Sequence, residues 1–277
     1  MTTNQLTPPI ILIRGGGDIA SGVAIQLIRA GFHVLISELA SPLMVRRAVS
    51  FGQAVFDGTC QVEEIVGELA KTSFHAQAIM QDGRVAVLVD PDLKVSQELP
   101  VAAIVDARMI KRKSDQLLNA APIIIGLGPG FTAGKNCHAV IETIRGENLG
   151  RVYWQGSAEP DTGIPEPVNG FARERVLYSP ADGVLLSNWE IGDLIEPNVQ
   201  IASVNGKPIF SSFRGVLRGL IQNGMAVKKG MKVGDLDPQC EIRKCYLVSD
   251  KALKVGDGVL EVLSTDPTLR NRTGKSI

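Results

Sequence analysis

Residues 10–38 read IILIRGGGDIASGVAIQLIRAGFHVLISE and decide how the first half of the chain folds. The run at residues 10–13 is continuously apolar, as expected of a strand that is buried on both faces of a parallel sheet. A glycine-rich turn follows, then apolar residues at helical spacing that end at Gly31, and then a second apolar strand at residues 33–37. This stretch therefore predicts a strand–helix–strand unit.

The same alternation continues along the chain. Further strands are expected at residues 85–89, 102–106 and 123–127, and helices at residues 42–50, 62–71 and about 137–145. Strands that alternate with helices favour a doubly wound α/β fold. We therefore expect residues 8–175 to form a Rossmann-like α/β domain with a parallel sheet.

The turn after the first strand matches the G-x-G-x-x-A pattern of dinucleotide-binding folds. In that pattern the first glycine allows a tight turn, the second lets a phosphate approach the backbone, and the small third residue lets the helix pack against the strand. Gly15 and Gly17 take the first two roles, and Glu38 lies about 20 residues further on, where an acid that binds a ribose is expected. Asp18 suits the helix dipole but would repel a pyrophosphate. The pattern thus fits either a bound nucleotide or a domain of this shape without one, with Asp18 as a cap.

A second glycine-rich turn at residues 126–136 reads GLGPGFTAGKN and follows an apolar strand. It resembles a P-loop but lacks two essential groups. Pro129 stands where the first glycine belongs, and Asn136 stands where a Ser or Thr would bind magnesium. A nucleotide triphosphatase is therefore not expected, and the segment fits either another kind of anion-binding loop or a tight turn.

The ends of the predicted strands gather these groups at one rim. Ligands of open α/β sheets bind beyond the carboxyl ends of the strands. Asp106 ends another predicted strand, which fits either a rim residue or an ordinary turn residue. No catalytic residue is identified, and no metal site is expected. The candidate cofactor-binding residues are Gly15, Gly17, Asp18, Glu38, Asp106, Gly128, Gly130, Thr132 and Lys135.

Composition narrows the class of protein. The chain has 29 basic and 29 acidic residues, so no global charge points to nucleic acid. Residues 207–254 hold ten Lys/Arg against four Asp/Glu, which fits either a solvated basic face or a surface for an acidic partner or an anionic ligand. The four cysteines lack disulfide or zinc spacing. No signal peptide pattern and no apolar run near the roughly 20 residues of a membrane span is evident. We expect a cytoplasmic protein without a membrane partner.

An internal repeat marks the C-terminal third. Residues 181–202 and 213–234 superimpose without a gap at an offset of 32 residues, which places Gly183 on Gly215. Two similar β units that share one core are therefore expected. The pattern resembles the biotinyl/lipoyl family, a barrel-sandwich hybrid whose carrier lysine sits on the hairpin between its halves. Lys207 lies in that connection without the family's Met-Lys-Met or Asp-Lys-Ala surroundings, so we expect an unmodified barrel, and a carrier role is not decided.

The rest of the organisation follows from this repeat. The all-β barrel is placed at residues 176–240, and a short C-terminal helical segment with a tail at residues 241–277. Helical spacing of apolar residues up to Leu263, with Asp250 as the expected cap, supports the helix.

Four longer motifs resemble one family as a set. They are IRGGGDIASG at residues 13–22, GLGPGFTAG at 126–134, HAVIETIRGENLGRVYWQGSAEPDTGIP at 138–165 and RVLYSPADGVL at 175–185. They are similar to the YqeB-type proteins of the selenium-dependent molybdenum hydroxylase system, from residue 10 to about residue 264. The resemblance implies an accessory role in maturing such a hydroxylase, with the hydroxylase or its maturation machinery as partner. It does not imply hydroxylase activity, because the chain has no iron–sulfur cysteine pattern and is too short for a molybdenum active site.

Three functions stay open from the sequence. The leading hypothesis is an accessory protein that binds a small phosphorylated ligand at the rim, with NAD, another nucleotide or the molybdopterin cofactor as candidates. The second is an NAD-dependent oxidoreductase, since Glu38 favours NAD over NADP, although no catalytic histidine or lysine–tyrosine pair is evident. The third is a non-catalytic docking or scaffold protein. The residues do not choose the ligand, a reaction or an oligomeric state.

Overall fold

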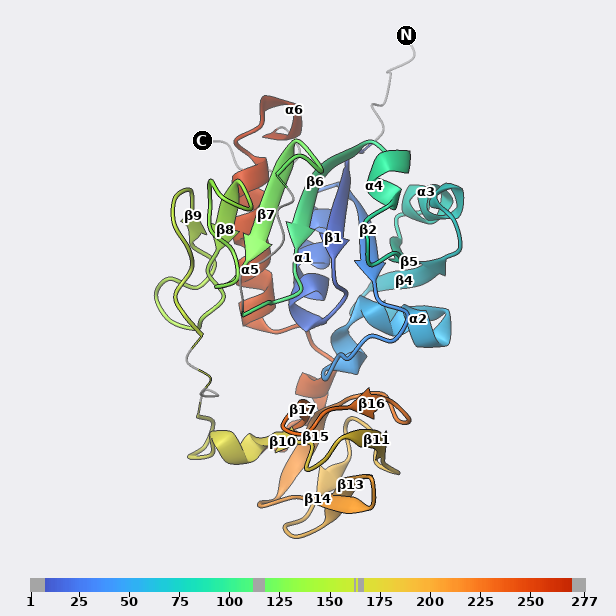
Figure 1. Ribbon diagram of the computed structural model, residues 1–277, viewed down its shortest axis with the longest axis vertical. Helices are drawn as coiled ribbons and strands as arrows, with labels where there is room; N and C mark the ends of the chain where they lie inside the picture. Colours follow the sequence, from blue (N-terminus) through green and yellow to red (C-terminus); the bar gives the residue numbers. More distant parts are fainter. Residues whose placement is uncertain (1–7, 112–117, 162, 164–166, 271–277) are drawn as a thin grey trace.

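The computed structural model describes residues 8–111, 118–161, 163 and 167–270. It contains a large, mostly parallel sheet and, below it in Figure 1, two smaller antiparallel sheets, with a C-terminal helix beside the large sheet. The mixed α/β organisation with a separate β unit agrees with the sequence expectation. Residues 271–277 of the expected tail lie outside the described residues. Within the described ranges, no helix is both long and apolar enough to cross a membrane.

The large sheet has nine strands in the order β3-β4-β5-β2-β1-β6-β7-β8-β9. Neighbours from β4 to β8 pair in parallel, whereas β3 and β9 at the edges pair antiparallel. The strands are β1 (Ile10–Arg14), β2 (His33–Glu38), β3 (Thr59–Val62), β4 (Ile65–Ala70), β5 (Val85–Val89), β6 (Val101–Asp106), β7 (Ile123–Leu127), β8 (Ala139–Ile141) and β9 (Val152–Tyr153).

Strand β1 lies at the centre of this sheet and is covered on both faces. Ile11 and Ile13 point into one hydrophobic core, and Leu12 points into the other; all three are fully buried. This alternation explains why the strand is apolar at every position. The sequence prediction of a doubly covered strand is confirmed.

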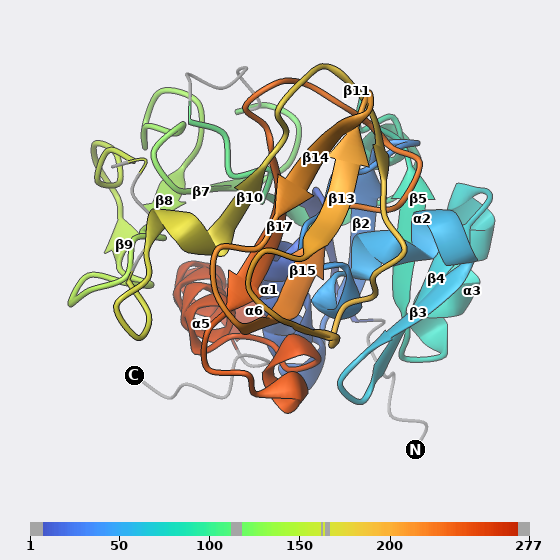
Figure 2. The same cartoon turned by 90° about the horizontal axis from the view of Figure 1, so that it is seen from below.

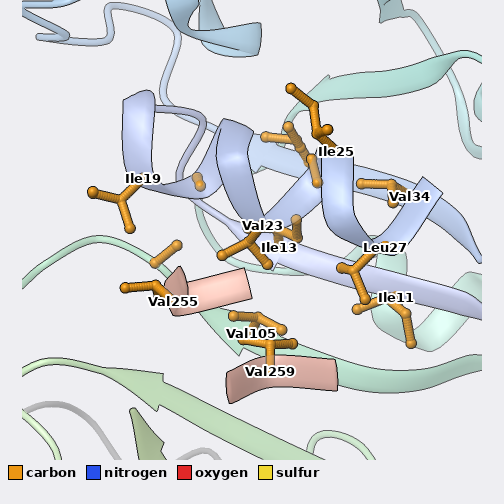
Figure 3. Close-up of a cluster of buried hydrophobic side chains, with 14 of the residues drawn as sticks. Ile11, Ile13, Ile19, Val23, Ile25, Leu27, Val34, Val105, Val255 and Val259 are labelled. Atoms are coloured by element: carbon orange, nitrogen blue, oxygen red, sulfur yellow. The ribbon is translucent and has the colours of Figure 1, made fainter. Parts of the chain in front are cut away.

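Helices cover the two faces of the large sheet unequally. α1 (Asp18–Arg29) and α5 (Asp250–Leu263) pack on one face, whereas α3 (Ser73–Gln81) and α4 (Val95–Glu98) pack on the other. Figure 3 shows Val23 of α1 close to Val255 and Val259 of α5. The two helices approach so closely that a Cβ added at Gly22 would lie 2.4 Å from the Cβ of Ala252. The C-terminal helix therefore belongs to the core of the large sheet.

Three expected helices are wrong and one helix boundary shifts. Residues 42–50 contain a single 3-10 turn, η1 (Arg47–Val49), and residues 62–71 form the β3–β4 hairpin. Residues 137–145 contain β8, whose parallel pairing with β7 leaves no room for a helix. Helix α5 is present where expected, but its cap is Ser249, whose Oγ accepts a hydrogen bond from the backbone N–H of Ala252 at 3.2 Å. The remaining short helical elements are η2 (Phe51–Gln53), α2 (Ala54–Asp57), η3 (Arg173–Arg175), η4 (Ile242–Cys245) and α6 (Pro267–Arg270).

The small β unit consists of two four-stranded sheets, ordered β10-β17-β15-β12 and β14-β13-β11-β16. Its strands are β10 (Val176–Tyr178), β11 (Gly183–Leu186), β12 (Leu194–Ile195), β13 (Gln200–Val204), β14 (Lys207–Phe210), β15 (Gly215–Leu220), β16 (Ala226–Val227) and β17 (Lys232–Asp237).

The sequence repeat reappears in the hydrogen bonds of this unit. The N–H of Leu185 donates to the carbonyl of Met225 at 2.9 Å, and 32 residues along each strand the N–H of Leu217 donates to the carbonyl of Asp193 at 2.8 Å. Likewise β11 pairs with β16 and β15 pairs with β12, so each half lends one strand to the sheet of the other. The predicted duplication around one shared core is therefore confirmed.

The two units meet at the carboxyl ends of the parallel strands. In Figure 1 the arrows of β1, β6 and β7 point toward the small β unit, and Figure 2 shows that unit lying across this edge of the sheet. From β1 the chain builds outward through β2 to β5, and then crosses back to β6 on the other side. The direction of winding thus reverses between β1 and β6, where ligands of open α/β sheets bind.

Candidate functional site

A cavity of about 760 Å³ opens at this reversal point, within the size range of cofactor sites. The glycine turn after β1 forms its floor, the end of β2 forms one wall, and the turn after β6 forms another. Lys232 at the start of β17 closes it from the side of the small β unit. The charged residues that line it are Arg14, Asp18, Glu38, Arg46, Asp92, Arg108 and Lys232.

The three consecutive glycines of the turn have different surroundings. Gly15 has a φ of +94°, which side chains rarely adopt, and its N–H donates to the carbonyl of Ser37 at 2.8 Å. Gly16 is packed against Gly52, whose Cα would lie 2.8 Å from an added Cβ. Gly17 has no atom within 4 Å of an added Cβ. The turn therefore needs glycine at two positions for its own structure, and at Gly17 it exposes bare backbone to the cavity.

Gly17 is also the N-cap of α1, and no side chain caps this helix. The first backbone N–H groups of a helix lack partners within the helix, and together with the helix dipole they favour an anion. Asp18 brings a carboxylate to the same place, but its Oδ2 lies 3.7 Å from Nη1 of Arg46. This ion pair offsets the repulsion that the sequence predicted between Asp18 and a phosphate.

Glu38 ends β2 and is folded onto the glycine turn. Its Oε2 accepts a hydrogen bond from the N–H of Gly16 at 2.6 Å, and its Oε1 accepts one from the N–H of Leu39 at 2.7 Å. An ionised carboxylate offers about four acceptor positions, so two remain for a ligand. The side chain is mostly buried and lines the cavity.

Asp106 lies below the cavity and is fully buried. Its carboxylate binds the guanidinium of Arg108 through two hydrogen bonds, Nε to Oδ1 at 2.9 Å and Nη2 to Oδ2 at 2.7 Å. Arg14 lies 3.7 Å from the same carboxylate. Asp106 therefore positions two arginines whose side chains line the cavity, and it does not line the cavity itself.

The second glycine turn is mostly separate from this cavity. Gly128 has a φ of +84° and its N–H donates to the carbonyl of Ile141, while the carbonyl of Gly130 lies 3.5 Å from Nδ2 of Asn136. The carboxamide of Asn136 also accepts a hydrogen bond from the N–H of Thr132 at 2.8 Å. Asn136 thus closes the loop on itself. The loop then returns across the sheet face that carries α3 and α4, because Phe131 and Cys137 are buried there.

Two further candidates lie on this returning segment. Thr132 Oγ1 lies 2.7 Å from Ser157 Oγ, and Lys135 is exposed. The structure therefore brings Gly15, Gly17, Asp18 and Glu38 together at one cavity and places Asp106 beneath it. It does not bring Gly128, Gly130, Thr132 or Lys135 to the lining of that cavity.

Several cationic residues of the cavity were not singled out from the sequence. Arg14 and Arg108 follow the ends of β1 and β6, so the rule that ligands bind at strand ends had a signal for both. Arg46 lies in the irregular segment after β2, and Lys232 comes from the small β unit; neither position carries a local pattern. In the described part of the chain, no group of three or more His, Cys, Asp or Glu is arranged to hold a metal ion.

Comparison with known proteins places the chain by sequence. No family model matches it. It is 44% identical to the uncharacterized protein YqeB of Escherichia coli (strain K12) over 254 residues, which is 92% of this chain. The chain is a YqeB-type homologue. The four motifs predicted this relationship. The chain spans 47% of the Escherichia coli protein, so about half of YqeB has no counterpart here.

Solved structures add little. An aspartoacylase family protein from Mesorhizobium loti aligns over 83% of this chain and 85% of its own, with 10% identity and a TM-score of 0.25. The ectoine utilization protein EutE (DoeB) from Ruegeria pomeroyi aligns over 83% and 86%, with 11% identity and a TM-score of 0.23. Likeness at this level carries no argument about the fold or the activity of this YqeB-type chain.

Proposed function

We propose that this YqeB-type chain is an accessory protein that binds a nucleotide or another phosphorylated cofactor at the glycine turn after β1. One observation carries the proposal: Gly17 presents bare backbone to the cavity at an uncapped helix start, although the neighbouring Gly15 and Gly16 serve the turn itself. A phosphate at this point accepts hydrogen bonds from the first N–H groups of α1.

The charges around Gly17 support a phosphorylated ligand. Arg46 pairs with Asp18, and Arg14 and Arg108 bring two more guanidinium groups to the cavity. Arginine is suited to phosphate because its planar fork donates two parallel hydrogen bonds. Burial lowers the pKa of Arg46, and the nearby charge of Arg218 lowers it further, so an anion in the cavity would stabilise the charged form.

Glu38 supports a ribose beside that phosphate. The two acceptor positions that Gly16 and Leu39 leave unused suit the paired hydroxyls of an unmodified ribose. A carboxylate in this place disfavours a ribose that carries a 2′-phosphate, so NAD is preferred over NADP within the dinucleotides. The molybdopterin cofactor is the other candidate, since it also carries a phosphate.

The topology supports a Rossmann-like domain. When the edge strands are set aside, the order β5-β2-β1-β6-β7-β8 has the pattern 3-2-1-4-5-6 of dinucleotide-binding sheets. The exchanged strands of the small β unit likewise support a barrel-sandwich hybrid. In that unit Lys207 is exposed directly after a turn with positive φ at Asn205 and Gly206, and we propose that it stays unmodified.

The accessory role itself rests on the family resemblance. We propose that the chain acts in the maturation of a selenium-dependent molybdenum hydroxylase, with the hydroxylase or its maturation machinery as partner. A pull-down from a host that makes such a hydroxylase tests the partner, and recovery of no protein of this system contradicts it.

Ligand binding is tested by thermal shift and calorimetry. The panel comprises NAD, NADP, AMP, ADP, GDP, CDP and molybdopterin species, applied to the wild type and to Gly17→Val. The variant fills open space at a backbone conformation that valine adopts, so it is expected to fold. We expect at least one compound to stabilise the wild type and not the variant. If no compound stabilises the wild type, or if Gly17→Val binds as tightly, the glycine turn is not the site.

A further inference from the structure

A second cavity, of about 800 Å³, lies between the start of α1, the start of α5 and strands β15 and β17. It adjoins the first cavity, because both are lined by Asp18, Ile19, Arg46, Met109 and Lys232. Its walls are rich in arginine. The segment with the local excess of positive charge supplies much of one wall through Arg218, Lys232, Lys244 and Lys251.

Arg218 on β15 is the least satisfied cation in this cavity. Its side chain is 21% exposed, and its Nη1 lies 3.5 Å from Oδ2 of Asp237. Its Nε is buried and has no hydrogen-bond partner among the described residues. A guanidinium carries five N–H donors, and buried donors are almost always paired. This side chain is therefore built to donate to something beyond the described residues.

Arg46 reaches the same cavity from the large sheet. Its side chain is 9% exposed, and Nη2 donates to the backbone carbonyls of Lys244 at 3.2 Å and Leu247 at 3.1 Å. Those two bonds fix the guanidinium in place, while Nε has no partner within the described part of the chain. The charge of Arg218 lowers the pKa of Arg46, so the two guanidinium groups repel each other. An anion beside both would remove that repulsion.

The other ion pairs of the cavity are long. Asp235 lies 3.9 Å from Arg175 and 3.9 Å from Lys232, so two cations share one carboxylate. By contrast, Arg145 and Asp250 at the rim are joined by two hydrogen bonds of 2.8 Å. The inner carboxylates therefore hold the cations near the cavity without using up their donors.

We propose that this arginine pocket binds a phosphoryl group between Arg46 and Arg218. A tetrahedral dianion offers several acceptor oxygens to two guanidinium forks and balances their charges. The group comes either from free phosphate or from a second phosphorylated part of the ligand held at Gly17. Its recognition rests on Arg218 and not on the glycine turn, so it stands if the proposed nucleotide site fails.

The test is calorimetric titration of the full chain with inorganic phosphate, pyrophosphate and ADP. Arg218→Gln removes the cation, and Arg214→Gln is the matched control: it makes the same change of charge on the same β unit, but Arg214 is 59% exposed and pairs with Glu196 outside the cavity. We expect Arg218→Gln to weaken binding of at least one probe about tenfold or more, as the loss of a charge-assisted hydrogen bond implies. Arg214→Gln should bind like the wild type.

A second variant guards against misfolding. Lys232→Gln removes another cation of the cavity whose side chain is 45% exposed, and it should weaken binding of the same probe without lowering the unfolding temperature. Gly17→Val separates the two sources. Free phosphate is the source if phosphate still binds this variant, and a nucleotide spanning both cavities is the source if ADP is lost in Gly17→Val and Arg218→Gln alike. Binding of every probe by Arg218→Gln at wild-type affinity, or binding of none by the wild type, overturns the proposal.

Discussion

Gly17→Ser is expected to stabilise the protein and weaken its ligand binding at the same time. Gly17 has φ −72° and ψ −176°, an extended conformation that serine adopts without strain, and an added Cβ meets no atom within 4 Å. Serine is a favoured N-cap, because its Oγ accepts a hydrogen bond from the second or third helical N–H. In α1 those groups belong to Ile19 and Ala20.

The gain in stability has two sources. Replacing a glycine at a compatible conformation restricts the unfolded chain and contributes about 0.4–1 kcal/mol. A serine cap adds roughly a few tenths of a kcal/mol over glycine. The free energy of unfolding should therefore rise by about 0.5–1.3 kcal/mol. For a chain of this size that corresponds to roughly 1–5 °C in Tm.

Ligand affinity should move in the opposite direction. The new Oγ engages one of the amides that a phosphate needs and occupies the space that a phosphate would enter. Loss of one charge-assisted hydrogen bond costs about 1.5–3 kcal/mol, or roughly a 10- to 150-fold weaker affinity. Urea unfolding followed by circular dichroism measures the first effect, and calorimetry with the tightest nucleotide measures the second.

The same substitution two residues earlier is the control. Gly15→Ser places serine at φ +94° and should lower stability. If Gly17→Ser lowers the free energy of unfolding, the open conformation assigned to Gly17 is wrong. If it raises stability and leaves affinity unchanged, phosphate does not bind at this helix start.

Three further predictions concern stability. Gly22→Ala should destabilise by about 1–3 kcal/mol in urea unfolding, despite the better helix propensity of alanine, because its Cβ would lie 2.4 Å from the Cβ of Ala252; a more stable variant would disprove this helix crossing. Both Gly192→Ala and Gly224→Ala place alanine at positive φ, but Gly192→Ala should have the lower Tm, since its Cβ would also lie 2.6 Å from the hydroxyl of Tyr246; equal Tm values would contradict this. The hydrogen bond from Arg145 lowers the pKa of Asp250 from 3.8 to about 2, so this carboxylate stabilises the fold above about pH 4 and the contribution fades as the pH falls toward 2. The stability difference between wild type and Asp250→Asn should shrink over that range, and a difference that persists at pH 2 would exclude this cause.

The central strand–helix–strand unit was predictable because its signals are local. Consecutive apolar residues, a glycine turn and helical spacing all lie within residues 10–38, and each agrees with the structure. The repeat in the small β unit was predictable for a related reason. An offset of 32 residues is visible without any knowledge of packing, and it reappears bond for bond in the exchanged strands.

The β3–β4 hairpin was not predictable from spacing. Val62, Ile65, Val66 and Leu69 fall at intervals of three and four, as on the face of a helix. In the structure Val62 and Ile65 face each other across a two-residue turn, and parallel pairing of β4 with β5 fixes the segment at the sheet edge. Pairing with a distant strand outweighed the local pattern, as is common for short elements.

The candidate site was predictable in part, for the same reason. Gly15, Gly17, Asp18 and Glu38 follow from the ends of two neighbouring strands, and the structure brings them together. The second glycine turn seemed equivalent because it also follows a strand. Its chain, however, returns across the face of the sheet to pair β8 beside β7, which carries Thr132 and Lys135 away from the rim.

The small β unit belongs to the site, because of how the glycine turn is packed. Gly52 covers Gly16, and Glu38 takes the N–H of Gly16, so a ligand approaches the turn only at Gly17. The cavity at Gly17 is closed by Arg46 and by Lys232 of β17. A phosphate there lies against both units at once, and its affinity depends on how they are held together. A ligand bound at Gly17 should therefore raise the unfolding temperature of the small β unit as well as that of the large sheet.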